Sequence, residues 1–468
     1  MRLLRACYTA VLLTACGSEP SSPTDAGALR DTSAPTDAPG DVTADAPEDE
    51  GLAPLRYQPE GCMHTVHTTE GTRGNFRGDT ATFGPRATPR AVHTGWAADP
   101  STTIAIAWNT DAATRASVVQ IGESPDRMDR TVVGHVSTGG LSTNVVSVHE
   151  VHVCGLRPDT TYHYRVGGEG HWSATQSFRT APAPGRTDYD VNMVVFGDSR
   201  DRVEVWAALQ PRVAQVSAMR QPDLALFTGD AVLFGPFQTM WDQWFDAARM
   251  SMARMPFVMA HGNHEGLAIN YLMQFAQPQA DDPQQDELYF SFDYGPIHLV
   301  VLNDTPRGGA LDALSGPELT WLRADLTRAN ANRARVPWVV VMHHKALFSA
   351  SSHVDDDDVI YLRERWAPVY DEFGVDVVFN GHEHDFELAD GIDGRGMPLA
   401  GRRGTAYYTS GGAGAPLYGG TPQRWTRHIE RIENFLMVRA TMRAFEVVPY
   451  RADGTVITEG RRMLAPRM

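Results

Sequence analysis

The sequence has few cysteines, no apolar run of transmembrane length and a deficit of positive charge. Four cysteines occur in 468 residues, and none has the spacing of a thiolate metal site or a catalytic nucleophile. The apolar runs are shorter than the roughly 20 residues that a membrane-spanning helix needs. The formal charge is −16, from 41 basic and 57 acidic residues. This balance argues against nucleic acid as a partner.

The first residues indicate export. Arg2 and Arg5 precede a short apolar run and then Leu13-Thr14-Ala15-Cys16, which has the form of a secretory signal. This string also resembles the bacterial lipobox, which implies cleavage before Cys16 and lipid attachment to it; a plain secretory signal is the alternative. We expect a lipoprotein signal peptide over 1–15 and a lipid-anchored protein of the bacterial cell envelope, at the outer membrane or in the periplasm.

A segment without aromatic residues follows. Residues 17–53 hold nine acids and one arginine and consist mainly of Ala, Pro, Asp, Thr, Ser and Gly. Such a composition cannot bury enough surface to offset the entropy of the chain. We therefore predict a disordered acidic tether over 16–54.

Residues 55–183 have the pattern of an irregular strap followed by an all-β domain. Short alternating stretches such as 102–108 and 161–166, with turn residues between them, are typical of a sandwich. The string Leu-x-Pro-x-Thr-x-Tyr-x-Tyr-x-Val at 156–166 resembles a fibronectin type III module. The resemblance implies that Tyr162 is its tyrosine corner and Trp108 its core tryptophan. In an oxidising compartment, Cys62 and Cys154 are expected to form a disulfide, with two buried thiols as the alternative.

From 184 to 468 the pattern changes to strands that alternate with helices, which indicates an α/β domain. Helices are expected from about 200 to 219 with a break at Pro211, and over 237–253, 317–331 and 359–373, the last ending at Gly374. Gly295-Pro296 predicts a hairpin. The apolar stretches predict strands over 191–196, 224–228, 256–260, 337–342, 375–379, 405–409, 434–440, 444–449 and 454–457.

Several of these strands end in side chains that bind hard or borderline metals. The motifs are Gly197-Asp198, Gly229-Asp230, Gly262-Asn263-His264-Glu265, His343-His344 and Gly381-His382-Glu383-His384. Ligands of this kind gather at the carboxyl ends of strands in open α/β sheets, and they suit iron, zinc or manganese. Two such metals sharing a carboxylate can activate water and neutralise a phosphoryl group. We predict a dinuclear site built from Asp198, Asp230, Asn263, His343, His382 and His384.

In this order the motifs resemble those of the calcineurin-like metallophosphoesterases, and the β module in front resembles the purple acid phosphatase branch. The resemblance implies a four-layer α/β/β/α sandwich in which Asp230 bridges the metals. By the same resemblance, His264 contacts the substrate phosphate and assists the leaving group, Glu265 orients His264, and His353 is a substrate-side histidine. For His353, a loop position without a role is the alternative. Metal one would be bound by Asp198 and His384, and metal two by Asn263, His343 and His382.

The sequence departs from the family pattern at two positions. The purple branch has a metal-binding tyrosine three residues after the bridging aspartate, where this chain has Leu233, so the purple iron–tyrosinate site is not expected. The wider family has a histidine two residues after the first aspartate, where this chain has Arg200. Arg200 is expected either to bind substrate phosphate with its guanidinium fork or to pair with Asp198 or another nearby carboxylate.

Together these features predict a phosphoesterase that hydrolyses phosphomonoesters by attack of a metal-bound hydroxide. The alternatives are a phosphodiesterase or nucleotide phosphohydrolase, and a surface lipoprotein that binds through its β module and has a degenerate site. The expected partners are small phosphoesters, and a membrane through the N-terminal lipid only.

Overall fold

The computed structural model describes residues 53–139, 145–217, 221–282, 285–306, 316–399 and 403–467. The predicted signal peptide, Cys16 and the predicted tether up to residue 52 lie outside these ranges. The described residues belong to one compact unit that spans Asp49–Met468. None of their helices combines the length and the apolar character needed to cross a membrane.

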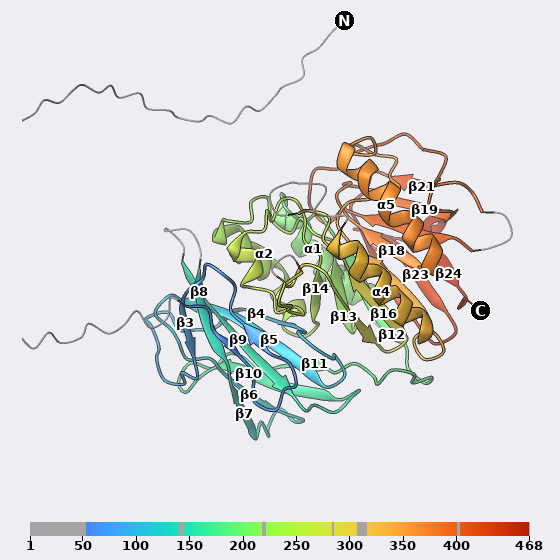
Figure 1. The fold of residues 1–468 in the computed structure, drawn as a ribbon. Helices are drawn as coiled ribbons and strands as arrows, with labels where there is room; N and C mark the ends of the chain where they lie inside the picture. Colours follow the sequence, from blue (N-terminus) through green and yellow to red (C-terminus); the bar gives the residue numbers. More distant parts are fainter. Residues whose placement is uncertain are drawn as a thin grey trace, which may run out of the picture. The chain divides into compact units, whose positions relative to one another are not determined.

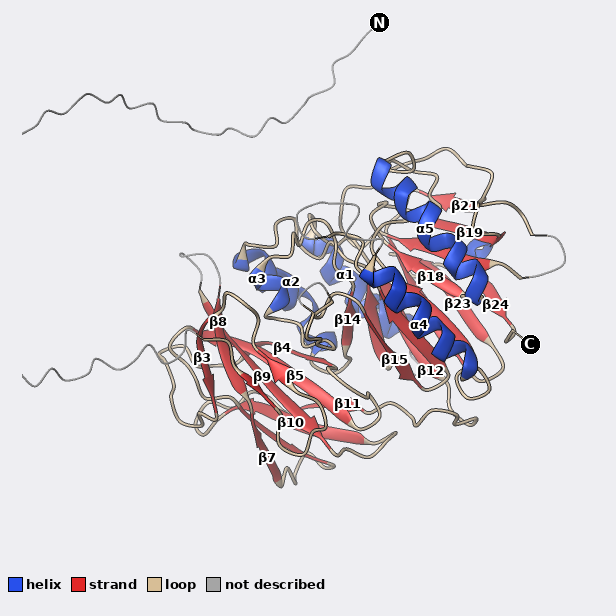
Figure 2. Cartoon of the chain, viewed as in Figure 1, coloured by secondary structure: helices blue, strands red, loops and turns tan. Residues whose placement is uncertain are grey.

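The N-terminal part is all-β (Figures 1 and 2). Alternation of apolar and polar residues gives each strand one buried face, and the two sheets pack these faces together around Trp108 and Tyr164. The Tyr162 hydroxyl accepts a hydrogen bond from the Arg157 backbone N–H at 3.0 Å. One sheet has the order β3-β8-β9-β5-β4 and the other β11-β10-β6-β7. Their strands are β3 (Arg73–Arg77), β4 (Arg90–Gly95), β5 (Thr103–Asp111), β6 (Val118–Gly122), β7 (Arg130–Val133), β8 (His135–Gly139), β9 (Val146–Cys154), β10 (Thr161–Gly167) and β11 (Gln176–Arg179).

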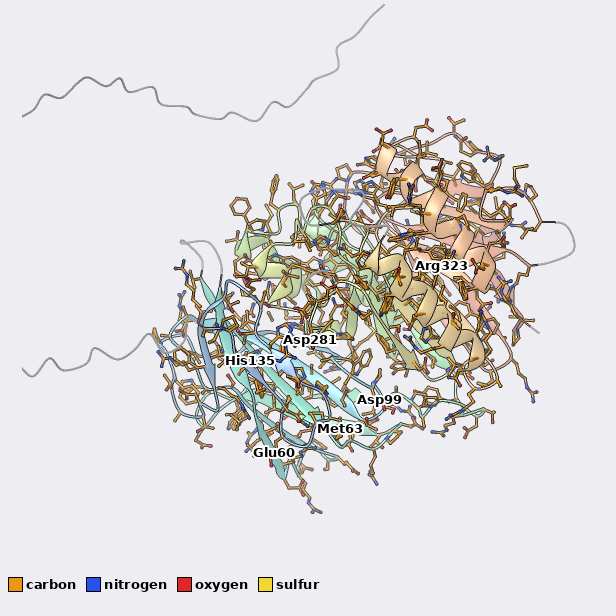
Figure 3. All side chains as sticks on the ribbon, in the orientation of Figure 1. Glu60, Met63, Asp99, His135, Asp281 and Arg323 are labelled. Carbon is orange, nitrogen blue, oxygen red and sulfur yellow. A yellow bond between two sulfur atoms is a disulfide. The ribbon has the colours of Figure 1, made fainter. Side chains whose placement is uncertain are left out.

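A short strap precedes this sandwich and contains the antiparallel pair β1 (Arg56–Tyr57) and β2 (Val66–His67). A disulfide joins Cys62 of the strap to Cys154 of β9. The strap also contacts the C-terminal part, because Arg56 pairs with Asp281 at 2.5 Å; Asp281 is labelled in Figure 3. The strap is therefore attached to both parts of the chain.

The C-terminal part contains two mixed sheets packed face to face. The first has the order β14-β13-β12-β22-β23-β24, and the second β15-β16-β17-β18-β20-β19-β21. Strands β12, β13 and β14 pair in parallel, as do β16, β17, β18 and β20. The strands are β12 (Val191–Phe196), β13 (Leu224–Phe227), β14 (Phe257–Met259), β15 (Phe290–Tyr294), β16 (Ile297–Val301), β17 (Trp338–Met342), β18 (Val377–Asn380), β19 (Phe386–Ile392), β20 (Thr405–Ser410), β21 (Thr426–Glu430), β22 (Asn434–Ala440), β23 (Phe445–Arg451) and β24 (Arg462–Leu464).

Helices cover the outer face of each sheet. Apolar side chains of α1 and α2 pack on the first sheet, and those of α4 and α5 pack on the second. A third apolar core lies between the sheets and is continuous with the core of the N-terminal sandwich. The helices are α1 (Val203–Val216), α2 (Gln238–Met252), α3 (Ile269–Leu272), α4 (Pro317–Ala331), α5 (Asp357–Phe373) and the 3-10 helix η3 (Thr458–Gly460). The predicted α/β/β/α sandwich behind an all-β domain is confirmed.

Three local predictions need correction. Helix α1 continues through Pro211 without a break. The predicted strand over 454–457 is wrong, because Val456 makes only an isolated bridge to Tyr450 before η3 begins. In the C-terminal part, strands β19, β21 and β24 and the short helix α3 were not predicted. By contrast, α5 ends as expected at Gly374, whose φ of 63° lies in the left-handed region that glycine adopts without strain.

Candidate metal centre

The motif-bearing loops follow parallel strands of both sheets and meet at one edge of the sandwich. Asp198 follows β12, Asp230 follows β13 and His344 follows β17. Each offers one ligand atom, and the three atoms lie within 4.8 Å of one another. All three side chains are buried. Two buried carboxylates and an imidazole at this spacing form a potential metal-binding cluster.

The two aspartates are held by unusual backbone. Their φ angles, 59° for Asp198 and 58° for Asp230, lie in the left-handed region that non-glycine residues rarely adopt. Such strain persists only where the surroundings fix it. Glycines of two other motifs pack against these carboxylates: a Cβ at Gly381 would lie 2.3 Å from Asp198 Oδ2, and one at Gly262 would lie 2.3 Å from Asp230 Oδ1. Those motifs therefore need glycine for close approach.

Glu265 fixes the loop that carries Asp230 by bonding to its backbone. Its buried carboxylate accepts hydrogen bonds from the backbone N–H groups of Asp230 at 3.0 Å, Ala231 at 2.7 Å and Gly262 at 2.8 Å. Burial, and then the charge of Asp230, raise the pKa of Glu265 to about 7. The expected role of Glu265 in orienting the His264 ring is replaced by a role in holding the backbone of two motifs together.

His264 is oriented by a different group. Its Nδ1 lies 2.8 Å from the carbonyl oxygen of Leu233. Because a carbonyl only accepts, Nδ1 carries the proton of this bond. Nε2 then faces the cluster, 3.8 Å from Asp230 Oδ2. The His264 backbone N–H also donates to Asp230 Oδ1 at 2.9 Å.

The structure places His343 away from the cluster and His344 in it. His343 is fully buried, with Nδ1 3.1 Å from Asp304 Oδ2 and its ring packed against Trp366. His344 donates from Nδ1 to the Thr228 carbonyl at 2.8 Å. Its Nε2 lies 3.4 Å from Asp230 Oδ1 and 3.0 Å from the Oδ1 of Asn263. The nitrogen that faces the cluster is therefore that of His344, and not that of His343, to which we assigned a ligand position.

His382 and His384, the histidines of the last motif, add two more potential metal ligands to the cluster. His382 has its Nδ1 3.2 Å from Nε2 of His344. His384 donates from Nδ1 to the Pro416 carbonyl at 2.8 Å, and its Nε2 lies 3.5 Å from Asp198 Oδ1. Metal-binding histidines usually donate one ring N–H to such a carbonyl, which leaves the other ring nitrogen free to bind the metal.

His353 lies beside these metal-binding donors and is not one of them. Its imidazole centroid is 4.3 Å from that of His382. Its Nδ1 lies 3.2 Å from Glu383 Oε2, and its backbone N–H donates to Glu383 Oε1 at 2.7 Å. The bond to Glu383 raises the pKa of His353. The Glu383 carboxylate thus favours the protonated form of His353 at the edge of the cluster.

Arg200 is near the cluster but bonded elsewhere. It pairs with Asp201 at 2.9 Å, and its Nε lies 3.7 Å from Asp230 Oδ2. This buried Nε has no hydrogen-bond partner among the described residues. Arg200 also bonds to Tyr418, whose ring stacks on His384 with centroids 4.1 Å apart.

The sequence did not single out Tyr418 or Asp304, and no role was expected for Glu383 within its motif. Asp304 and Glu383 bond to His343 and His353, respectively. Tyr418 follows a glycine-rich segment after β20 and matches no motif. That segment lies against the site, because the Ala415 backbone N–H donates to the Asp198 carbonyl at 2.8 Å. The segment serves as a supporting backbone turn.

The electrostatics of the cluster favour bound cations. Burial raises the pKa of Asp198, whereas His344 outweighs burial and lowers that of Asp230. Burial lowers the pKa of His344, but the nearby Asp230 carboxylate outweighs burial and raises this pKa from 6.5 to about 10. The buried carboxylates thus favour positive charge beside them. With oxygen and imidazole donors, such a site fits a pair of hard or borderline metal ions.

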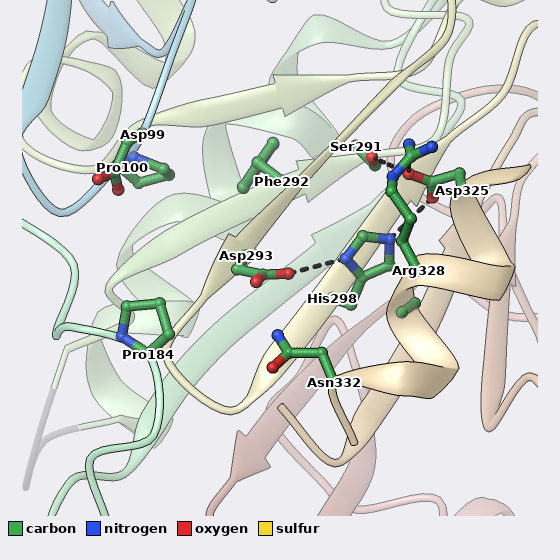
Figure 4. A pocket seen from close by; sticks show the side chains of 11 residues that line it. Asp99, Pro100, Pro184, Ser291, Phe292, Asp293, His298, Asp325, Arg328 and Asn332 are labelled. Carbon is green, nitrogen blue, oxygen red and sulfur yellow. Dashed lines mark hydrogen bonds and ion pairs between the residues drawn. The ribbon is translucent and has the colours of Figure 1, made fainter. Parts of the chain in front are cut away.

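A separate polar cluster lies in a pocket lined by Asp99 and Pro184, which shares no lining residue with these motifs (Figure 4). His298 of β16 lies between Asp293, 2.7 Å from Nδ1, and Asp325, 2.8 Å from Nε2. Both imidazole nitrogens therefore donate, and the ring is positively charged. This arrangement joins the β15–β16 hairpin to α4.

Comparisons with known proteins agree with this geometry. Residues 89–180 match the purple acid phosphatase N-terminal domain, and residues 186–386 match the calcineurin-like phosphoesterase family. The chain is 27% identical over 315 residues to purple acid phosphatase 21 of Arabidopsis thaliana, covering 65% of this chain and 67% of that protein. It is 27% identical over 361 residues to human acid phosphatase type 7, covering 70% of this chain and 79% of the relative.

Among solved structures, a purple acid phosphatase from yellow lupin (Lupinus luteus) seeds shares the fold. The TM-score is 0.67 at 18% identity, covering 81% of this chain and 74% of the lupin chain. The fold implies a dinuclear metal centre, at the edge where Asp198, Asp230 and His344 converge. The chain belongs to the purple acid phosphatase-like branch of the calcineurin-like metallophosphoesterases and is a metal-dependent phosphoesterase.

Proposed function

We propose that the chain hydrolyses phosphomonoesters at a dinuclear centre. The observation that carries this proposal is the convergence of buried donors from both sheets at one edge, beside His264 and His353. The proposed ligands are Asp198, Asp230, Asn263, His344, His382 and His384. Asp230 is the proposed bridge, because its two carboxylate oxygens face different sides: Oδ1 lies near His344, and Oδ2 lies near Arg200 and His264.

The metals proposed for this donor set are iron, zinc or manganese. When bound, the pair supplies an activated water and neutralises phosphoryl charge. We propose that the centre has no iron–tyrosinate bond at the position of Leu233, which offers only a backbone carbonyl that already bonds to His264. The metal-loaded protein should then show no intense visible charge-transfer band, and a purple colour would contradict this part of the proposal.

Three side chains are proposed to handle the phosphate and its proton. His264 is fixed through Nδ1, so a proton on Nε2 can be donated to the leaving oxygen. His353, whose protonated form is favoured by Glu383, and Arg200 can contact the non-bridging phosphate oxygens. These positive groups offset the negative charge of the whole chain where the substrate binds.

This arrangement favours monoesters over diesters, because a doubly charged phosphate gains more from several cationic groups than a singly charged one. The test compares p-nitrophenyl phosphate with bis(p-nitrophenyl) phosphate, using protein loaded with each metal in turn. We expect higher kcat/KM for the monoester and loss of turnover in Asn263→Ala. Preference for the diester would favour a phosphodiesterase.

The same experiment separates the enzyme from a binding protein with a degenerate site. A degenerate site would hold one metal ion or none and would turn over neither ester. Two metal ions per chain, with activity that depends on Asn263, would exclude it.

We further propose that lipid on Cys16 anchors the chain at a bacterial cell envelope. The support is the string Leu13-Thr14-Ala15-Cys16. In a bacterial expression host, Cys16→Ser should move the protein from the membrane fraction to the soluble fraction. Continued sedimentation with membranes would contradict the anchor.

A further inference from the structure

Two exposed phenylalanines stand next to the proposed proton donor. Phe234 is 51% exposed and Phe237 is 48% exposed, and their ring centroids are 6.0 Å apart. Among the exposed large apolar side chains of the described residues, these are the two aromatic ones. The remainder of the described phenylalanine rings are largely covered, so this pair is unusual in the molecule.

The turn that carries the pair is firmly held. The Phe237 backbone N–H donates to the Phe234 carbonyl at 3.1 Å, and the Trp241 indole N–H donates to the Gly235 carbonyl at 2.8 Å. A Cβ at Gly235 would lie 2.0 Å from the Glu265 carbonyl oxygen, so the turn packs tightly on the motif that contains His264. The exposure of the rings therefore belongs to an ordered structure.

The same turn connects directly to His264. The Leu233 carbonyl, which adjoins Phe234, accepts the bond from His264 Nδ1 at 2.8 Å. The Gly235 backbone N–H donates to the His264 carbonyl at 3.0 Å. Phe234 and Phe237 therefore stand on the turn that orients the proposed proton donor, one imidazole ring away from the Nε2 that faces the cluster.

We propose that Phe234 and Phe237 form a leaving-group subsite that favours phosphomonoesters of aromatic alcohols. This inference rests on the proposed function. An aromatic ring on the leaving oxygen would pack against the two phenylalanine rings in stacked or edge-to-face contact. A small alkyl group covers too little of this surface to gain the same contact.

The test compares the ratio of kcat/KM for 2-naphthyl phosphate to that for ethyl phosphate in the wild-type chain and in Phe234→Ala and Phe237→Ala. The intrinsic reactivities of the two esters differ, but this difference cancels when the ratio is compared between variants. We expect the ratio to fall about tenfold, with inhibition by inorganic phosphate unchanged. An unchanged ratio, or an equal fall for both esters, would overturn the proposal.

Two controls guard against loss of folding. Phe234→Leu keeps an apolar side chain and should retain part of the preference. Met463→Ala removes a side chain that is 65% exposed on β24, at the opposite edge of the sheet from β14, and should change nothing.

A binding measurement keeps this inference separate from the proposed function. Calorimetric titration of the metal-loaded protein with phenylphosphonate and with methylphosphonate reports the subsite without turnover. Tighter binding of phenylphosphonate, lost in Phe234→Ala, supports the subsite even if no ester is hydrolysed, in which case only the proposed function fails. Equal binding of the two phosphonates would overturn the subsite. A change in oligomeric state in Phe234→Ala with no change in ligand preference would also overturn it, and would assign the pair to contact between copies of the chain.

Discussion

His344 faces the cluster and His343 faces the core, so substitutions of these two adjacent histidines should have different effects. His344→Ala removes an imidazole whose Nε2 lies 3.4 Å from Asp230 Oδ1, whereas His343→Ala removes one that faces Asp304 and Trp366. The first change should reduce the metal content of the chain, and the second should reduce its stability. Because neighbours of metal ligands already change affinity by about 10- to 100-fold, loss of His344 should weaken one metal site by about 100-fold or more.

The cost of His343→Ala follows from its surroundings. The substitution opens space in a packed core and leaves the buried Asp304 carboxylate without one of its partners. Burial raises the pKa of Asp304, but His343 outweighs it and lowers that pKa, so Asp304 is ionised and depends on its partner. A cavity together with an unpaired buried charge costs about 3–5 kcal/mol of unfolding free energy.

The assay is metal content by mass spectrometry after equilibration with each metal, together with denaturant unfolding of the same samples. We expect His344→Ala to lose about one metal ion per chain and His343→Ala to keep both below its lowered unfolding midpoint. The opposite pattern, with metal lost from His343→Ala and kept in His344→Ala, would refute the assignment.

Three further predictions concern charge and cross-linking. Burial lowers the pKa of His298, but Asp293 and Asp325 overcome this and raise it from 6.5 to about 9; the stabilisation is therefore complete below about pH 6.5 and is lost as the pH rises through 9. Unfolding free energy measured by denaturant titration should fall by up to about 3 kcal/mol over that range, and an equal fall in His298→Gln would contradict this origin. Replacing Cys62 and Cys154 with serine opens a link between residues 92 positions apart and should cost about 2–5 kcal/mol, and an unchanged unfolding midpoint would argue against it. Arg200→Lys should raise KM for phosphomonoesters because the fork is lost, and unchanged KM and kcat would exclude a substrate role.

The sequence was most informative where chemistry and secondary structure coincide. Buried parallel strands appear as short apolar runs, and a ligand-type residue directly after such a run marks the edge where the strand ends meet. This pattern predicts Asp198, Asp230 and the glycine-flanked motifs as site residues. The closing strands over 434–440 and 444–449 were equally clear, because β22 and β23 present regular apolar patterns.

The residues that could not be predicted depend on contacts between distant parts of the chain. Strand β17 is buried throughout, so alternation along it gives no sign of which following histidine faces the cluster. The choice is made by Asp304, 39 positions before His343. Strand β19 was missed because it contains Glu387, whose buried carboxylate is bonded to Ser349 and to the Ala350 backbone N–H. Tyr418 is positioned by its stacking on His384, which no local pattern encodes.

The most direct test of the dinuclear centre is an anomalous diffraction map of metal-loaded crystals, recorded above the absorption edge of the metal. We predict two peaks about 3.5–4 Å apart, one on each side of the Asp230 carboxylate, with His344 rather than His343 beside one of them. A single peak, or two peaks that do not share Asp230, would contradict the proposed centre.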